Sequence, residues 1–273
     1  MVPISGVESR YKDERRFWED LRKGGDEVEL KYARDLPDDT PEFILKTLIS
    51  FEDDVTRFCF DEASGRVLDA GCGNGNLLMR SRRGFSGFTY VGLDFSRNML
   101  ARAAARSGGM NDAHFYQGCV NKLPFKSEIF DRVVSSGVLT CLSSVEEARE
   151  AISEYNRVLK TQGVLVVDFF NKASHFTRLR EHVLGEMITP PEYMTPEEFE
   201  SDLTGAGFEV LECRGFDYKP YQGYLFMSRW RPIIDPAFVQ ERLSRIIESK
   251  VAPRIPSINL LGYRIYVKCR KLR

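Results

Sequence analysis

Short apolar runs alternate with amphipathic segments from residue 66 onward. The first runs are "RVLDA" at 66–70 and "FTYVGLD" at 88–94, and the helical pattern "SRNMLARAAARS" follows at 96–107. Apolar strands separated by helical segments are typical of a parallel sheet with helices on both faces. The pattern therefore predicts an α/β, doubly wound, mostly parallel sheet. Its seven expected strands cover residues 66–70, 88–94, 113–118, 130–136, 163–170, 208–214 and 262–271. Its expected helices cover residues 76–81, 96–107, 144–160, 174–184 and 195–205.

Two helical segments are expected ahead of this sheet. Apolar residues recur at three- and four-residue spacing from Tyr11 to Leu21 and from Glu42 to Phe58, the second after the start signal "DDTPE". We predict that residues 1–60 form an N-terminal helical cap and that residues 61–214 form the core.

A long segment separates the last two expected strands. Residues 215–261 are rich in proline and aromatic side chains and include one amphipathic helix near 236–250. A connection of that length inside a compact domain is usually functional or disordered. We predict an inserted cap on the substrate side, with residues 262–273 completing the sheet. The aromatic side chains of 218–230 form either the wall of an acceptor pocket or the small core of the cap itself.

The charge of the chain is unevenly distributed. The 273 residues carry a net charge of -1, with 42% hydrophobic and 29% charged residues, as in an ordinary globular protein. Residues 218–273, however, contain 12 Lys or Arg against 3 Asp or Glu. This basic quarter is either a landing surface for an anionic substrate, nucleic acid or membrane, or a set of solvated helix-face charges.

Six cysteines have neither a CxxC pair nor a framework spacing, which indicates neither a zinc site nor a disulfide scaffold. The N-terminal sequence has no signal-peptide pattern, and no apolar run approaches the ~18 residues that span a bilayer. We therefore expect a cytoplasmic setting and no membrane span.

A glycine-rich turn follows the first expected strand, in "GRVLDAGCGNGNLL" at 65–78. Glycine tolerates positive φ and allows a ligand to lie against bare backbone. Asp69 precedes the first glycine of the pair Gly71 and Gly73, where it would repel a pyrophosphate and suits a ligand with an ammonium group. Asp94 ends the second strand, where an acid is placed to bind both hydroxyls of a ribose.

Four ordered segments carry a resemblance to a known family: "VLDAGCGNGNLL", "VGLDFSRNML", "LPFKSEIFDRVVSSGVL" and "VLKTQGVLVVDFF". Together they resemble the class I S-adenosylmethionine-dependent methyltransferases of the small-molecule type, similar to methyltransferase domains 11 and 25. The match covers about 66–170 and resumes weakly at "YMTPEEFESDLTGAGFEV". It implies a Rossmann-like fold and S-adenosylmethionine as cofactor, with S-adenosylhomocysteine as product.

The resemblance also implies roles for matching residues. Asp69 would organise the turn around the methionine ammonium, Gly71 and Gly73 would pass beneath the methionine and ribose, and Asp94 would bind the ribose diol. The remaining residues expected at the cofactor are Asn76 in the turn, Phe95 and Met99 on the adenine ring, Cys119 and Val120 at its edge, and Ser135 and Ser136 beside the methionine.

Cys119 departs from the family pattern, and the residues at the ends of the fourth and fifth strands bear on a metal site. An aspartate often accepts the adenine amino group where this chain has Cys119, and a thiol is a poor acceptor, so Cys119 is alternatively a small buried hydrophobe. A catechol-type metal site would want carboxylates at the ends of the fourth and fifth strands, but serines occupy the former and Asp168 with Asn171 is only a partial match. We therefore expect no metal.

Candidates for acceptor chemistry lie near the fifth strand and the N-terminus. Asn171 could hold a polar group of the acceptor, with a turn-forming asparagine as the alternative. His175, and less favourably His182, could act as a general base, with surface placement as the alternative. Tyr11 could close over the methionine end as part of a lid, or pack within its own helix. His114, inside the third strand, is expected to be structural.

These features favour a metal-independent enzyme that moves a methyl group to oxygen or nitrogen of a small, anionic or partly apolar acceptor. A tRNA or rRNA methyltransferase is less favoured because neither an [ND]-P-P-[YF] tetrad after the fourth strand nor a Pro-Cys pair is present. A non-catalytic cofactor-binding relative is the third alternative. The acceptor and the oligomeric state stay open at this point.

Overall fold

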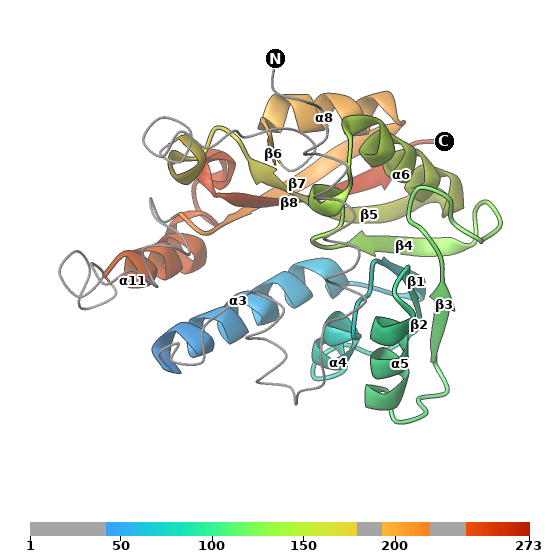
Figure 1. Ribbon diagram of the computed structural model, residues 1–273. Helices are drawn as coiled ribbons and strands as arrows, with labels where there is room; N and C mark the ends of the chain where they lie inside the picture. The colour runs from blue at the N-terminus through green and yellow to red at the C-terminus, as the bar shows by residue number, and fades with distance from the viewer. Residues whose placement is uncertain (1–41, 179–192, 219–238) are drawn as a thin grey trace, which may run out of the picture.

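The computed structural model describes residues 42–178, 193–218 and 239–273 (Figure 1). Tyr11, His182 and most of the aromatic run at 218–230 lie outside these residues. The core is one mixed sheet in the order β3-β2-β1-β4-β5-β8-β7, with the two-residue strand β6 paired to β5. The strands are β1 Gly65–Ala70, β2 Phe88–Asp94, β3 Ala113–Gln117, β4 Phe130–Ser135, β5 Leu159–Asn171, β6 Tyr193–Met194, β7 Phe208–Phe216 and β8 Arg264–Lys271.

The first five strands of the chain pair in parallel, and β8 runs antiparallel to both β5 and β7. The predicted seven-stranded, mostly parallel, doubly wound sheet is therefore confirmed. The carboxyl ends of β1, β2, β4 and β5 meet at one edge, and the reversed β8 begins at that same edge. This is the edge at which open α/β sheets bind ligands.

Helices cover both faces of the sheet (Figure 1). Helices α6 (Val145–Val158) and α8 (Pro196–Gly205) lie on one face, while α3 (Glu42–Phe60), α4 (Asn76–Ser81) and α5 (Arg97–Arg106) lie on the other. Alternate strand residues enter the two layers: Leu68 joins the core beneath α6, and Val67 joins the core beneath α3. This alternation follows from the two-residue period of a strand.

The helices begin where polar side chains cap them. Ser96 and Ser144 accept hydrogen bonds from Met99 N and Glu147 N at the starts of α5 and α6. Thr195 and Glu198 form a reciprocal capping box at the start of α8. Each cap satisfies backbone donors that have no partner within the helix.

Several predicted boundaries shift. Strand β5 begins four residues earlier than expected because Leu159 pairs with Phe130 across a register shift. The short strand β6 was not predicted. The helix expected at 236–250 is described as α11 (Val239–Ile246) followed by a π-helical turn at Ile247–Val251. The helix expected at 174–184 is helical at 175–178 and then leaves the described residues.

All six cysteines are free thiols. Among the described helices, none is long and apolar enough to cross a membrane.

Candidate active site

The glycine turn lies between the carboxyl end of β1 and the start of α4. Gly71 has φ +90° and donates its N–H to the Leu93 carbonyl at 2.7 Å, which ties the turn to β2. A Cβ at Gly71 would lie 2.2 Å from Val138 in the loop after β4, so a side chain here would collide with that loop. A Cβ at Gly73 would meet nothing within 4 Å, so the turn is open on that side.

Asp94 holds the turn from the end of β2. One carboxylate oxygen accepts the Gly73 N–H at 2.9 Å, and the other accepts the Ser96 N–H at 2.9 Å. The residue is only 8% exposed, and burial raises its pKa although backbone N–H donors act in the opposite direction. One nearly buried acid thus joins the turn after β1 to the start of α5 after β2.

Asp69 is a second buried acid, on β1. Its Oδ2 accepts the Tyr90 hydroxyl at 2.5 Å, while its Oδ1 is buried and has no hydrogen-bond partner within the described part of the chain. Burial raises the pKa of Asp69 to about 7, and the nearby Asp94 charge adds to the rise. A buried carboxylate oxygen without a donor is costly in water-free surroundings, and a ligand ammonium group would supply that donor.

The other residues expected at the adenine ring and in the turn differ in how exposed their side chains are. Met99 and Val120 are buried at 5% and 8%, Phe95 is half-buried, and Asn76 is half-buried as the first residue of α4. Cys119 is exposed, so the alternative of a small buried hydrophobe is wrong. It lies on the loop after edge strand β3.

Ser135 and Ser136 point to opposite faces of the sheet, as successive residues at a strand end do. Ser135 is fully buried and its hydroxyl lies 2.9 Å from that of Tyr155 on α6. Ser136 lies 2.7 Å from the Tyr266 hydroxyl on the α3 side. Ser135 therefore faces the α6 layer, and Ser136 is the serine on the side of Asp69.

A buried ion pair, which the sequence analysis missed, lies beside Ser136. Asp168 on β5 accepts the Gly137 N–H at 2.6 Å and the Arg264 Nε–H at 2.6 Å. The Arg264 guanidinium lies 5.0 Å from the centre of the Tyr266 ring and 16% of its side chain is exposed. The pair fixes the loop after β4, which in turn packs on Gly71. No local signal could have indicated it, because 96 residues separate the two charges.

The candidate acceptor residues are placed differently from one another. Asn171 is fully buried; its amide donates to the carbonyls of Leu260 and Gly262 at 2.8 and 3.0 Å, and its Oδ1 accepts the Ala173 N–H. This geometry favours the alternative of a turn-forming asparagine. His175 is exposed at the beginning of the helix after β5, and His114 is exposed on β3 rather than packed in the core. Tyr11 is outside the described residues.

Comparison with known proteins identifies the family. A family model described as a methyltransferase domain matches residues 61–202, just over half of the chain. The chain belongs to the methyltransferase domain family. It is an S-adenosylmethionine-dependent enzyme with the Rossmann-like methyltransferase fold, as the resemblance in the four sequence segments implied.

Relatives match over different lengths. The uncharacterized protein MJ0638 of Methanocaldococcus jannaschii is 26% identical over 245 residues, covering 82% of this chain and 94% of that protein. The ubiquinone/menaquinone biosynthesis C-methyltransferase UbiE of Desulfotalea psychrophila is 38% identical over 104 residues, which cover 38% of this chain and 40% of that enzyme. The crystal structure of magnesium protoporphyrin IX methyltransferase from Synechocystis, with bound SAH, has a TM-score of 0.59 at 16% identity and covers 96% of this chain and 99% of that one.

The described residues fit S-adenosylmethionine. The turn is open at Gly73, the Asp69 Oδ1 lacks a donor, and Asp94 ends β2 where it can accept ribose hydroxyls. When bound, the cofactor supplies an electrophilic methyl group on a sulfonium sulfur. The chain would hold it at the turn after β1, which the Leu93 carbonyl and the Asp94 carboxylate keep in place.

The buried Asp69 predicts a pH-dependent affinity for S-adenosylhomocysteine. Below pH 7 its carboxyl is largely protonated in the free protein and must lose that proton to bind an ammonium group. Affinity measured by calorimetry should rise with pH, by at most about tenfold per unit, and level off above pH 7. Asp69→Asn should bind more weakly and with a flatter profile. An unchanged slope in that variant would contradict the assignment.

Removing one partner of the Asp168–Arg264 ion pair should strongly destabilise the fold. Arg264→Gln leaves a buried carboxylate without its charge partner and should lower the free energy of unfolding by about 3–5 kcal/mol, measured with urea. Adding Asp168→Asn should recover part of the loss. The control is Arg270→Gln, whose exposed pair with Glu209 spans 3.9 Å and should contribute less than about 1 kcal/mol. Equal losses in Arg264→Gln and Arg270→Gln would count against the pair as a structural anchor.

Proposed function

We propose that this methyltransferase moves a methyl group to oxygen or nitrogen of a small-molecule acceptor, without a metal ion and mainly through proximity and orientation. The acceptor would lie beside the ends of β4, β5 and β8, roofed by the N-terminal helices and by residues 215–261. The cap boundaries at 60, 215 and 261 belong to this proposal.

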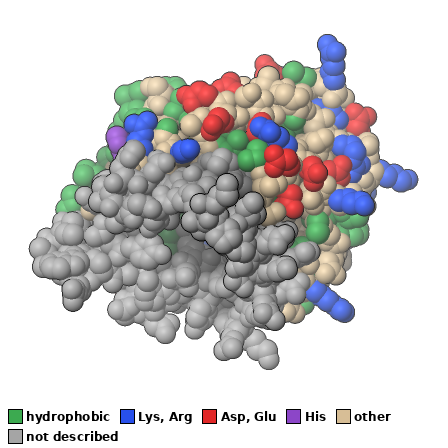
Figure 2. All heavy atoms as spheres, turned by 45° about the horizontal axis from the view of Figure 1, so that its top comes forward, with side chains coloured by type: hydrophobic (Ala, Val, Ile, Leu, Met, Phe, Trp, Pro, Cys, Tyr) green, Lys and Arg blue, Asp and Glu red, His purple; other side chains and the backbone are tan. Residues whose placement is uncertain are grey.

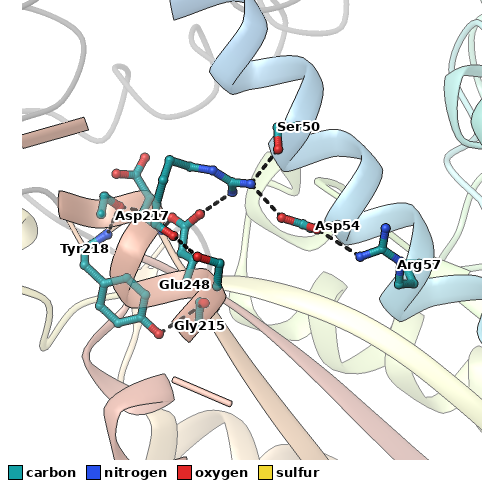
Figure 3. A network of polar contacts seen from close by, with 10 residues as sticks. Ser50, Asp54, Arg57, Gly215, Asp217, Tyr218 and Glu248 are labelled. Carbon is teal, nitrogen blue, oxygen red and sulfur yellow. Dashed lines mark hydrogen bonds and ion pairs between the residues drawn. The ribbon is translucent and has the colours of Figure 1, made fainter. Parts of the chain in front are cut away.

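The observation that carries the proposal is a polar network that joins α3 to the inserted segment (Figure 3). Arg245 of α11 donates to Asp54 and Ser50 of α3 at 2.8 and 2.6 Å and also pairs with Glu248. Glu248 in turn accepts the Asp217 N–H at 2.8 Å, just past the end of β7. Two segments nearly 200 residues apart in the chain are thereby joined to each other.

This network lies beside the end of the sheet where Arg264 sits. Phe216, the last residue of β7, pairs with Arg264 in the sheet and packs edge-on against Phe51 of α3 at 5.2 Å. The Arg264 guanidinium lies 5.9 Å from the same Phe51 ring. These contacts bring α3 and the end of β7 beside Arg264, which supports our proposal that α3 and the insertion enclose a compact acceptor there.

The charges of β8 support the same choice over a nucleic acid. Four of its basic side chains have acidic partners: Arg264 with Asp168, Lys268 with Glu212, Arg270 with Glu209 and Lys271 with Glu128. On the face shown in Figure 2, acidic and basic side chains are interspersed over the described surface. A phosphate track instead needs unpaired basic groups in a row.

Catalysis in this proposal rests on placing the acceptor atom in line with the breaking carbon–sulfur bond. Positioning can lower such a barrier by ~7–11 kcal/mol. The Asp168–Arg264 pair would keep the loop at Gly137 in place, and the caps would exclude water. His175 is the candidate base among the described residues, and a lid role for Tyr11 stays a prediction.

No metal enters this mechanism. Both oxygens of Asp168 are engaged by Gly137 and Arg264, so the carboxylate best placed on β5 already has its partners. Within residues 42–178, 193–218 and 239–273, no three His, Cys, Asp or Glu side chains group as metal ligands.

A carbon acceptor is the second candidate. The UbiE relative named above is a C-methyltransferase of quinone biosynthesis. A flat, partly apolar acceptor would suit the aromatic residues Phe51, Phe170 and Tyr263 near this end of the sheet, where Phe170 and Tyr263 stack at 4.9 Å.

The function is tested by following a labelled methyl group. The protein is incubated with methyl-labelled S-adenosylmethionine and a cell extract divided into small-molecule, lipid, RNA and protein fractions. We expect label in the small-molecule fraction, and much less of it when Asp94→Ala replaces the wild type at a limiting concentration of S-adenosylmethionine. Label in RNA or protein would contradict the proposal, and mass spectrometry of the product would separate oxygen, nitrogen and carbon acceptors.

Loss of the Arg245 contacts should loosen both α3 and residues 239–251. Arg245→Gln removes the link to Asp54 and should increase amide hydrogen exchange in α3 and in residues 239–251 together. Arg57→Gln is the control, because Arg57 contacts the same Asp54 at 3.2 Å but its side chain is 67% exposed. An increase in amide hydrogen exchange in only one of the two segments would show that α3 and residues 239–251 are not coupled.

A further inference from the structure

Exposed apolar side chains gather in one short part of the molecule. Nine large hydrophobic residues are exposed among those described, and six of them lie between residues 239 and 261. They are Val239, Leu243, Ile246, Ile255, Leu260 and Leu261, each 39–53% exposed. They lie in the segment proposed to roof the acceptor, but no step of the proposed function assigns a role to their side chains.

The apolar stripe of helix α11 faces solvent instead of the protein interior. Val239, Leu243 and Ile246 are spaced as i, i+4 and i+7, so they lie along one face. That face is exposed, whereas Glu241 and Ser244 of the same helix are 4% and 3% exposed. A helix of a globular protein ordinarily buries its apolar stripe and exposes its polar residues.

Specific hydrogen bonds hold the helix in this orientation. Ser244 accepts the Tyr218 N–H at 2.9 Å and donates to Glu248 at 3.0 Å. Arg245 then joins Glu248 to Asp54 of α3. These contacts fix the polar side inward, and consequently the apolar side faces out.

The exposed charged side chains of residues 239–261 all have one sign. Both acids of residues 239–261, Glu241 and Glu248, are buried, whereas Arg242, Lys250 and Arg254 are exposed. Residues 239–261 therefore present apolar and basic side chains to solvent, and neither of their two acids is exposed. In Figure 1, α11 projects beyond the end of the sheet, away from β3.

We propose that residues 239–261 form a docking surface for an anionic lipid bilayer. An amphipathic helix with basic flanks binds such a surface by placing its apolar face at the boundary of headgroups and acyl chains. Basic side chains near an anionic leaflet add to the attraction. A nucleic acid would use the basic residues but leave the six apolar ones exposed to water, so the lipid surface fits both observations. This surface accounts for part of the basic C-terminal quarter noted in the sequence.

Vesicle sedimentation of the full chain tests the proposal. We expect the protein to sediment with vesicles of phosphatidylcholine and phosphatidylglycerol, and much less with phosphatidylcholine alone or at high salt. The double variant Leu243→Ser, Ile246→Ser should bind roughly tenfold or more weakly. Lys250→Gln and Arg254→Gln should each weaken binding about fivefold at low salt.

A matched double variant distinguishes binding through residues 239–261 from nonspecific binding through any exposed apolar side chain. Leu211→Ser, Leu272→Ser removes two apolar side chains that are 41% and 47% exposed elsewhere, and should bind the vesicles as the wild type does. Thermal unfolding of each variant checks that the fold is intact. The proposal is overturned by an absence of binding to anionic vesicles, or by equal loss in the two double variants. It is equally overturned if Leu243→Ser, Ile246→Ser instead abolishes self-association or RNA binding in a protein that ignores vesicles.

Discussion

The hydrogen bond from Gly73 to Asp94 is the contact on which the functional edge of this protein depends. It joins the turn after β1 to the end of β2, so the turn cannot move independently of the sheet. The parallel pairing of β1 and β2 brings the two together, with Ala70 opposite Leu93. Burial of Asp94 is unfavourable for its charge, as its raised pKa indicates. Backbone N–H groups offset part of that cost, and ribose hydroxyls would do the same on our assignment of the cofactor site.

A chain of contacts leads from the glycine turn to Arg264, beside the region that we propose for the acceptor. Gly71 packs on Val138, the neighbouring Gly137 donates to Asp168, and Asp168 pairs with Arg264 at the start of β8. The antiparallel β8 is what allows this, because its first residue reaches the edge where the parallel strands end. The cofactor turn and the region we propose for the acceptor thus share one rigid set of contacts, whereas α3 and the insertion are joined through side chains such as Arg245.

The sequence predicted what short-range patterns determine. Apolar periodicity located all seven strands of the main sheet, and the four segments that resemble the methyltransferase family, with Asp69, Gly71, Gly73 and Asp94 among their residues, implied the cofactor. Features that depend on pairing between distant residues could not be predicted: Arg264 looked like one more basic residue, and Asp168 only like a failed metal ligand. Asn171 looked free to bind an acceptor because its partners Leu260 and Gly262 lie about 90 residues away. The sequence could not predict that the apolar face of α11 points to solvent, because periodicity indicates an apolar stripe but not the direction in which it faces.

The central claim is that S-adenosylmethionine lies at the carboxyl edge of the sheet, with its ribose held by Asp94. Calorimetric titration of S-adenosylhomocysteine into Asp94→Ala and Asp131→Ala tests it most directly, because Asp131 is an aspartate of the same sheet that pairs with Lys160 at the opposite edge. We predict that Asp94→Ala weakens binding by about 1–3 kcal/mol while Asp131→Ala leaves it unchanged. Equal affinity in both variants, with both folded, would contradict the account.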